Sequence, residues 1–256
     1  PKYTIIFEVK GLSKSFGGRS ALTDLDVTVS GSQIMGLIGP NGSGKTTTIN
    51  LVTGLLKADT GSVKLDGTDL TNKSADFIAK SGTARTFQNL RIFTRETVRN
   101  NIRVSQTTLC KSLFSKGFPF LSSSELALSE EADKLIEQFN LTHVANKRAA
   151  SLSYGEKKRL EIARALALKP RVLLLDEPAA GMNALELDWL ADTISGLKQS
   201  GLGIILVEHH MSLVMKVCDH ITVLNFGNKI AEGSPEEVTN NQEVITAYLG
   251  KDFSIA

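Results

Sequence analysis

The chain has 256 residues, 22% of them charged, and a formal net charge of +2 at pH 7. A chain of this length can bury a sizeable core, and its nearly balanced charge gives no support to nucleic-acid binding. No apolar run reaches the roughly 20 residues of a membrane-spanning helix, so we expect a chain without such a segment. The isolated residues Cys110 and Cys218 lack metal-ligand spacing, which predicts reduced thiols.

The first 30 residues predict two strands. Residues 5–10 are mostly apolar, and residues 22–29 alternate apolar and polar side chains, as a half-exposed antiparallel strand does. Between them, Phe16 stands beside Gly17 and Gly18 in what we expect to be a loop. Its ring could lie flat against a purine or pack locally, and the local sequence leaves both interpretations open.

Residues 39–46, GPNGSGKT, fill the pattern G-x-x-x-x-G-K-[ST] at every constrained position. A predicted strand at 34–38 precedes them and a predicted helix at 47–52 follows, which is the context that this phosphate-binding loop needs. Lys45 would reach the β- and γ-phosphates of a nucleoside triphosphate, and Thr46 would offer its hydroxyl to Mg²⁺. We expect the nucleotide to contact Gly39, Asn41, Gly42, Ser43, Gly44, Lys45, Thr46 and Thr47.

The middle of the chain changes in character. A strand at 83–87 is predicted to end on Gln88, a polar residue where a parallel strand would meet a ligand crevice. Residues 92–150 then read as a helical insertion, with helices at 94–102 and 124–139. Aromatic and basic residues at 109–121 form either a local core or a docking surface.

The last third predicts a second α/β region. A helix opens near residue 151, Pro170 stops it, and the apolar strand 171–175 leads to Asp176 and Glu177. Asp176 has the position of a Mg²⁺ ligand, and Glu177 could act on the attacking water or be a solvated surface acid. A helix at 184–199, strands at 203–207, 221–225 and 229–232, and a helical tail at 235–249 follow.

The order of these motifs resembles that of ATP-binding cassette (ABC) ATPases over essentially the whole chain. Residues 152–156, LSYGE, resemble the family signature LSGGQ, with Tyr154 for Gly and Glu156 for Gln. The resemblance implies an α/β phosphate-loop (RecA-like) core with an antiparallel β subdomain and a helical insertion. Residues 1–256 would form one cassette, with the core at about 1–91 and 151–234, the insertion at about 92–150 and a helical tail at 235–256.

The resemblance also implies roles for single residues. Phe16 would stack on adenine, Glu177 would be the catalytic carboxylate, and His209, at the end of the strand 203–207, would be the switch histidine. Thr46, Gln88 and Asp176 would hold Mg²⁺, with Gln88 also linking it to the transport machinery. Ser153 and Gly155 would bind the ATP held by a second subunit. Asn183 and His210 stand where Asp is common in the family.

Within the family, residues 84–89, 177–183 and 247–250 are similar to the ATPase subunits of branched-chain amino-acid importers. Urea/amide importers and lipopolysaccharide exporters share much of this pattern. The resemblance implies ATP and Mg²⁺ as cofactors, membrane permease subunits, a second identical or paralogous ATPase subunit and, for an importer, a substrate-binding protein. No nucleic acid is expected, and the location would be the cytoplasmic face of the membrane, where residues 92–121 would face the permease.

Two other classes of protein fit less well. A soluble ABC protein acting on nucleic acid or ribosomes usually carries paired cassettes or a long coiled coil, whereas this chain has one cassette and no sustained heptads. A GTPase needs an Asn-Lys-x-Asp motif, and residues 72–75, NKSA, fail at the fourth position. The sequence therefore favours the ATPase of a membrane transporter.

Overall fold

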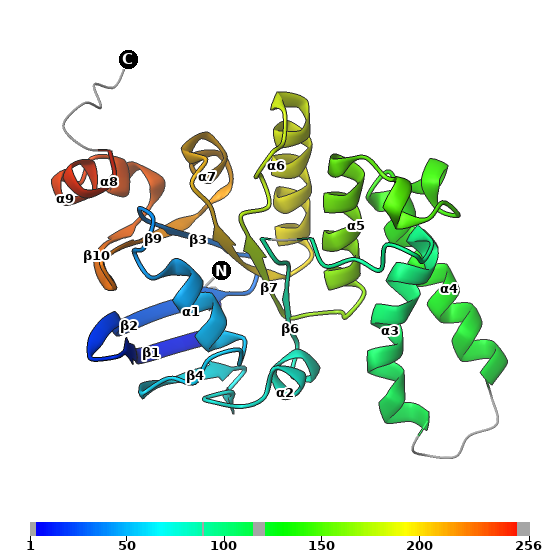
Figure 1. The fold of residues 1–256 in the computed structure, drawn as a ribbon, viewed down its shortest axis with the longest axis horizontal. Coiled ribbons are helices and arrows are strands. Elements are labelled where there is room, and N and C mark those ends of the chain that lie inside the picture. Colours follow the sequence, from blue (N-terminus) through cyan, green and yellow to red (C-terminus); the bar gives the residue numbers. More distant parts are fainter. Residues whose placement is uncertain (1–3, 89, 115–120, 250–256) are drawn as a thin grey trace. The chain divides into compact units, whose positions relative to one another are not determined.

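The computed structural model describes residues 4–88, 90–114 and 121–249 (Figure 1), and it leaves out the side chains of residues 5, 107–114, 121–127, 248 and 249. The chain divides into two compact units. Unit 1 comprises Pro1–Thr83 and Arg171–Ala256, and unit 2 comprises Ala84–Pro170. Within the described ranges, no helix is long and apolar enough to cross a membrane.

Unit 1 begins with an antiparallel sheet of four strands in the order β2-β1-β4-β5. The hairpin of the first two strands turns at Gly17 and Gly18, which both have positive φ, so its strands are longer than the sequence suggested. Phe16 is consequently the last residue of a strand, and our prediction that it lies in a loop was wrong. The strands are β1 (Ile5–Phe16), β2 (Arg19–Ser30), β4 (Thr60–Leu65) and β5 (Thr68–Asp69).

A second sheet in unit 1 has the order β10-β9-β3-β8-β7, in which β7, β8, β3 and β9 run parallel. Every residue of β3, β7 and β8 is buried, as expected for parallel strands covered on both faces. The strands are β3 (Ile34–Ile38), β7 (Val172–Asp176), β8 (Gly203–Val207), β9 (His220–Asn225) and β10 (Asn228–Gly233).

Helices cover both faces of this second sheet. Helix α1 (Lys45–Val52) lies between the two sheets, and α6 (Ala184–Gln199) and α7 (Met211–Val217) lie on the other side (Figure 1). The core that α1 shares with both sheets contains Val172 and Leu174 of β7. Because side chains alternate along a strand, Leu173 and Leu175 are buried on the opposite face.

The C-terminal tail at 235–249 is helical, as predicted, but it is divided into short segments. The first segment ends at Asn240, and Asn241 starts the next, because its side chain accepts hydrogen bonds from the backbone N–H groups of Glu243 (2.8 Å) and Val244 (3.3 Å). The segments are α8 (Pro235–Thr239), α9 (Gln242–Val244) and a π-helical turn (Ile245–Leu249).

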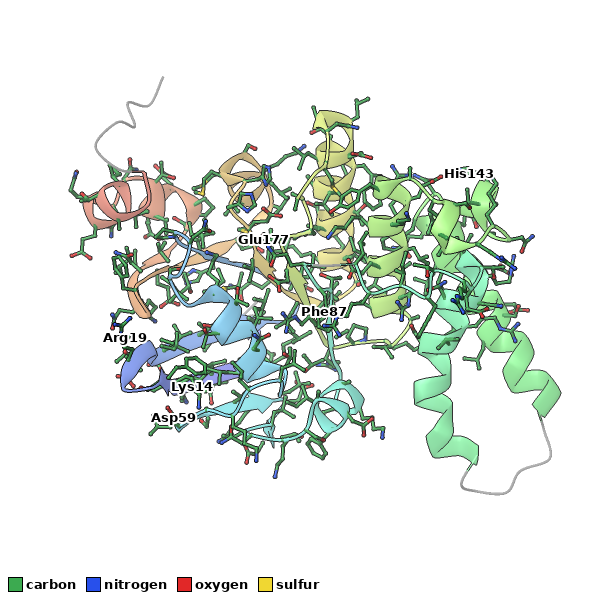
Figure 2. All side chains as sticks on the ribbon, in the orientation of Figure 1. Lys14, Arg19, Asp59, Phe87, His143 and Glu177 are labelled. Atoms are coloured by element: carbon green, nitrogen blue, oxygen red, sulfur yellow. The ribbon has the colours of Figure 1, made fainter. Side chains whose placement is uncertain are left out.

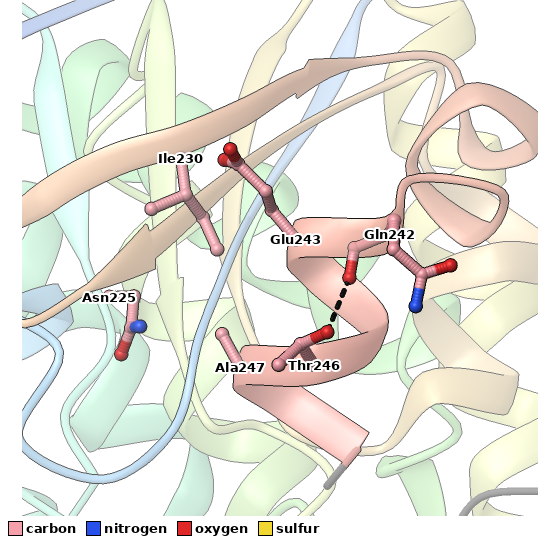
Figure 3. Close-up of a pocket in the computed structure, with 6 residues that line it drawn as sticks. All are labelled: Asn225, Ile230, Gln242, Glu243, Thr246 and Ala247. Carbon is pink, nitrogen blue, oxygen red and sulfur yellow. Dashed lines mark hydrogen bonds between the residues drawn. The ribbon is translucent and has the colours of Figure 1, made fainter. Parts of the chain in front are cut away.

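The tail and the sheet border a groove of about 430 Å³ (Figure 3). A hydrogen bond of 2.8 Å from the Thr246 hydroxyl to the Gln242 carbonyl closes one turn of its helical wall. No residue of the predicted nucleotide site lines this groove. Its lining consists of Asn225, Ile230, Gln242, Glu243, Thr246 and Ala247.

Unit 2 is mainly helical. Its first long helix begins at Val98 rather than at residue 94, because the Thr97 hydroxyl accepts the N–H of Asn100 (3.1 Å) and so starts the helix. Of the aromatic residues at 109–121, Phe118 and Phe120 lie outside the described residues, as does the side chain of Phe114. The helices are α3 (Val98–Phe114), α4 (Leu121–Gln138) and α5 (Tyr154–Leu166), with short 3₁₀ turns at Thr142–Val144 and Ala149–Ser151.

The boundary between the units lies in β6 (Thr83–Arg85), which follows α2 (Ala75–Lys80). This strand ends three residues before Gln88, so the prediction that Gln88 directly ends a strand was wrong. Gln88 lies instead in a bend after it.

The buried ring of Phe7 tests the shared core of unit 1. We expect Phe7→Ala to lower the free energy of unfolding by about 3–5 kcal/mol, because it leaves a cavity that the two sheets cannot close. Phe226→Ala is the matched control, since Phe226 is 80% exposed and its truncation should cost less than about 0.5 kcal/mol. Urea unfolding of both variants measures the difference, and equal stabilities would contradict the assigned core.

Candidate nucleotide-binding site

Three parallel strands of unit 1 end at the same level. In the central strand β8, Val207 pairs with Leu37 of β3 on one side and with Asp176 of β7 on the other. The phosphate loop, Glu177 and His209 therefore leave the sheet along one edge. Carboxyl ends of parallel strands are where open α/β sheets bind ligands.

The phosphate loop requires glycine at Gly39. Its φ is +151°, and a Cβ there would lie 2.2 Å from the carbonyl oxygen of Leu224 and 2.5 Å from Ser43 Oγ. Ser43 is itself buried in the turn, where its N–H donates to the carbonyl of Pro40 (3.1 Å). The loop is thus held closely against the end of the sheet.

Helix α1 begins without a side-chain cap. Its N-cap is Gly44, with φ +109° and no side-chain hydrogen bond, whereas α2, α5, α6 and α8 each begin at a Ser or Asn whose side chain accepts a backbone N–H. The first N–H groups of a helix need acceptors, and the helix dipole favours negative charge there. The start of α1 therefore fits the phosphates of a nucleotide.

Lys45 lies across this loop. Its Nζ donates to the carbonyl oxygens of Gly39 (2.7 Å) and Pro40 (3.1 Å), and the residue is only 7% exposed. Burial lowers the pKa of Lys45, while the nearby carboxylates of Glu177 and Asp176 act in the opposite direction. A buried ammonium beside the start of α1 suits it to hold phosphate charge.

The two predicted acids follow one another at the end of β7. Asp176 is buried, and Glu177 is a non-glycine residue with φ +47° whose N–H donates to the carbonyl of Val207 (2.9 Å). Figure 2 labels Glu177 at this end of the strand. The oxygen donors of Asp176 and of Thr46, which is exposed at the start of α1, are of the type that Mg²⁺ prefers.

His209 is the histidine that approaches Glu177. Its Nδ1 lies 3.9 Å from Glu177 Oε1, and its side chain is 51% exposed. The ring of His210 instead places Nδ1 3.2 Å from Oε2 of Glu208. The geometry therefore supports the choice of His209 over His210. Unit 1 as a whole brings together Lys45, Asp176, Glu177 and His209.

Phe16 presents an accessible aromatic surface at the end of β1, since its side chain is 48% exposed. Lys14 Nζ lies 5.5 Å from the centre of the ring and pairs with Asp59 Oδ1 at 2.7 Å. Asp59 also accepts the N–H of Ser15 (2.7 Å), which holds the end of the strand in place (Figure 2). This exposure favours the base-stacking interpretation over a packed ring.

Ser153 and Gly155 occupy the start of α5 in unit 2. The Ser153 hydroxyl accepts the N–H of Glu156 (3.3 Å), and Glu156 Oε2 accepts the N–H of Ser153 (2.7 Å), which completes a capping box. Glu156 Oε1 lies 2.9 Å from Nε2 of His143, labelled in Figure 2. Glu156 thus has a local structural role, and the Ser153 hydroxyl keeps its own proton to donate.

Gln88 is also in unit 2 and is exposed. A buried glutamate accepts hydrogen bonds from the backbone on both sides of it. Glu161 of α5 accepts the N–H groups of Phe87 (3.1 Å) and Arg91 (3.5 Å) and pairs with Lys158 at 3.7 Å. Burial raises the pKa of Glu161. The sequence analysis missed this residue, although a glutamate among apolar neighbours on a helix was a signal that could have identified it.

The chain matches the family described as "ABC transporter" over residues 22–180. It also matches "Branched-chain amino acid ATP-binding cassette transporter" over residues 228–254. Together, the two matches cover residues 22–180 and 228–254 and leave 181–227 outside.

Similar proteins extend over almost the whole chain. The branched-chain amino acid transport ATP-binding protein BraF of Pseudomonas aeruginosa is 42% identical, with 96% of this chain and 98% of BraF covered. LivG of Escherichia coli K12 is 40% identical with the same coverage. The lipopolysaccharide export ATP-binding protein LptB of Haemophilus influenzae is 36% identical, with 98% and 99% covered.

Solved structures of ATP-binding cassettes are similar to this chain in fold. The ADP conformation of MJ1267, an ATP-binding cassette of an ABC transporter, has a TM-score of 0.84 at 33% identity and covers 97% of this chain and 100% of its own. These matches confirm the predicted fold, an α/β cassette with an antiparallel β subdomain, and the predicted binding of ATP. The chain belongs to the ABC transporter family, in its subfamily of branched-chain amino acid ATP-binding cassettes.

Proposed function

We propose that this chain is the ATP-hydrolysing subunit of a branched-chain amino-acid importer. The observation that carries the proposal is the match over residues 228–254, which supports this assignment over the lipopolysaccharide exporter among the relatives. Permease subunits would supply the membrane path, and a substrate-binding protein would deliver the cargo. The subunit would work at the cytoplasmic face of the membrane, attached through those permeases.

The proposed ATP site uses the phosphate loop as a preformed anion cradle. The uncapped start of α1 and the Lys45 ammonium bind the β- and γ-phosphates, and the exposed ring of Phe16 carries the adenine. Thr46, Asp176 and Gln88 would hold Mg²⁺, which when bound neutralises developing phosphate charge. Gly39, Asn41, Gly42, Ser43 and Thr47 complete the contact with the nucleotide.

Hydrolysis then depends on two residues at the strand ends. Glu177 orients the attacking water and takes up its proton, and His209 contacts the γ-phosphate from the neighbouring strand end.

The proposed complete site needs a second cassette. Ser153 and Gly155 start α5 in unit 2, and the positive end of that helix with the Ser153 hydroxyl would bind the γ-phosphate held by the other subunit. Two head-to-tail subunits related by a two-fold axis make two identical sites and close on themselves. ATP binding would join the subunits and hydrolysis would release them.

We assign the rest of the chain to coupling. One cassette spans 1–256, with a core at about 1–91 and 151–234, an insertion at about 92–150 and the tail. Residues 92–121 would dock on the permease, and Gln88 would transmit the state of the nucleotide to that region. Glu161 supports this role of Gln88, because it joins both flanks of the Gln88 segment to α5.

Lys45→Ala tests the phosphate loop. We expect ATP turnover to fall at least about 100-fold, because one preformed donor to phosphate charge is lost. Lys73→Ala removes an exposed lysine of the same unit and should leave turnover unchanged. Phosphate release with Mg-ATP measures both variants, and normal turnover in Lys45→Ala would refute the assignment.

Glu177→Gln tests the shared site, because glutamine keeps the size of the side chain but cannot accept the proton of water. We expect a dimer in size-exclusion chromatography with Mg-ATP and a monomer with ADP. Adding Ser153→Arg should abolish that dimer while ATP binding persists. The matched control is Ser234→Arg, because Ser234 forms the same capping box on α8 and its loss also costs about 1 kcal/mol. A dimer that survives Ser153→Arg would contradict the arrangement.

The transport assignment is tested with the assembled complex. We expect the chain to co-purify with its permeases, and the reconstituted complex to take up labelled leucine, isoleucine or valine with ATP. Lys45→Ala should abolish that uptake. Transport of urea, amides or lipopolysaccharide instead would replace the substrate and leave the ATPase role intact.

A further inference from the structure

Glu208 is a buried acid at the centre of the proposed catalytic edge. It directly follows β8, the strand between the one that leads to the phosphate loop and the one that ends at Asp176. Its exposed fraction is 0%. A carboxylate this deeply buried is costly unless hydrogen bonds satisfy it.

Both oxygens of Glu208 are satisfied by neighbouring strand ends. Oε1 accepts the N–H of Ala179, in the turn after β7, at 2.7 Å. Oε2 accepts the N–H of His209 at 3.0 Å and that of His210 at 3.2 Å, and it lies 3.2 Å from Nδ1 of the His210 ring. One side chain thus joins the segment of Glu177 to the segment of His209.

Two hydrogen bonds from backbone N–H groups hold the turn that contains Glu177. The N–H of Glu177 donates to the carbonyl of Val207 (2.9 Å), and two residues later Ala179 donates to Glu208. Between the two bonds, Glu177 has φ +47°, a left-handed conformation that is uncommon for a non-glycine residue. The enclosed turn keeps Glu177 Oε1 3.9 Å from Nδ1 of His209.

We infer that Glu208 is a positioning residue for ATP hydrolysis, which sets the relative placement of Glu177 and His209 and acts only through them. The inference rests on the proposed ATPase function. A carboxylate suits this role because it is acceptor-only. A glutamine would offer one oxygen and turn an N–H group toward donors that need an acceptor.

Glu208→Gln is the test. We expect kcat for Mg-ATP to fall about 10- to 100-fold, because small misplacement of reacting groups costs rates of this size, while the Kd of ATP stays within about twofold. Glu232→Gln is a control for a Glu–His pair outside the proposed site, since the exposed Glu232 of β10 lies 2.9 Å from the ring of His220 on β9. That variant should keep its full kcat.

A combined variant separates positioning from a general loss of stability. In a background that carries both Glu177→Gln and His209→Gln, Glu208→Gln should lower the residual rate no further, because it acts through those two residues and such effects are not additive. Losses that multiply would overturn the inference, and so would an unchanged kcat in Glu208→Gln. If the unsubstituted protein hydrolyses no ATP at all, the proposed function itself is refuted.

If circular dichroism shows that Glu208→Gln does not fold, the variant His210→Phe tests the inference in its place. It keeps the ring volume and the backbone N–H but removes the ring nitrogen that faces Oε2. We expect kcat to fall about fivefold with the Kd of ATP unchanged, the size of effect that one lost hydrogen bond produces. An unchanged kcat in this variant would overturn the inference.

Discussion

The parallel pairing of β3, β8 and β7 is the constraint on which the site depends. Because Val207 is level with both Leu37 and Asp176, the segments that follow these strands begin at one edge although they lie far apart in the chain. A shift of one residue in either register would turn the buried side chains of a strand to the other face. The core around α1 therefore fixes the catalytic geometry through the register of the strands.

Buried charges connect these segments once the strands have aligned them. Lys45 is held by loop carbonyls, and Glu208 by backbone N–H groups from two strand ends. A buried charge that loses its partners costs several kcal/mol, which is a large part of the roughly 5–15 kcal/mol that stabilises a typical domain. The segments are thus restrained together, and the strained backbone at Glu177 persists because of it.

The sequence predicted those helices and strands whose bounds depend on the pattern of contiguous residues. The helix at 184–199 and the strand at 203–207 have the predicted bounds, since their apolar patterns are long and regular. The caps at Thr97 and Asn241 were not predicted, because polar side chains set these boundaries through contacts that periodicity does not reveal. The strand that ends at Phe16 is longer than predicted because the chain turns only at Gly17 and Gly18. The roles of Glu161 and Glu208 could not be predicted, because they depend on backbone N–H groups of residues distant in sequence. Glu161 binds those of Phe87 and Arg91, and Glu208 binds that of Ala179.

In the proposed shared site, the two helix starts would have different tasks because their chemistry differs. Helix α1 begins at a glycine, so its first N–H groups and Lys45 form a deep cradle that needs no side-chain cap. Helix α5 begins with the capping box of Ser153 and Glu156, which completes the helix before any nucleotide is bound and still leaves one hydroxyl proton to donate. In the proposed site, the first start would hold most of the phosphate charge, whereas the second would add only a few contacts. Such a difference would suit a switch, because a weak second contact would let loss of the γ-phosphate separate the subunits.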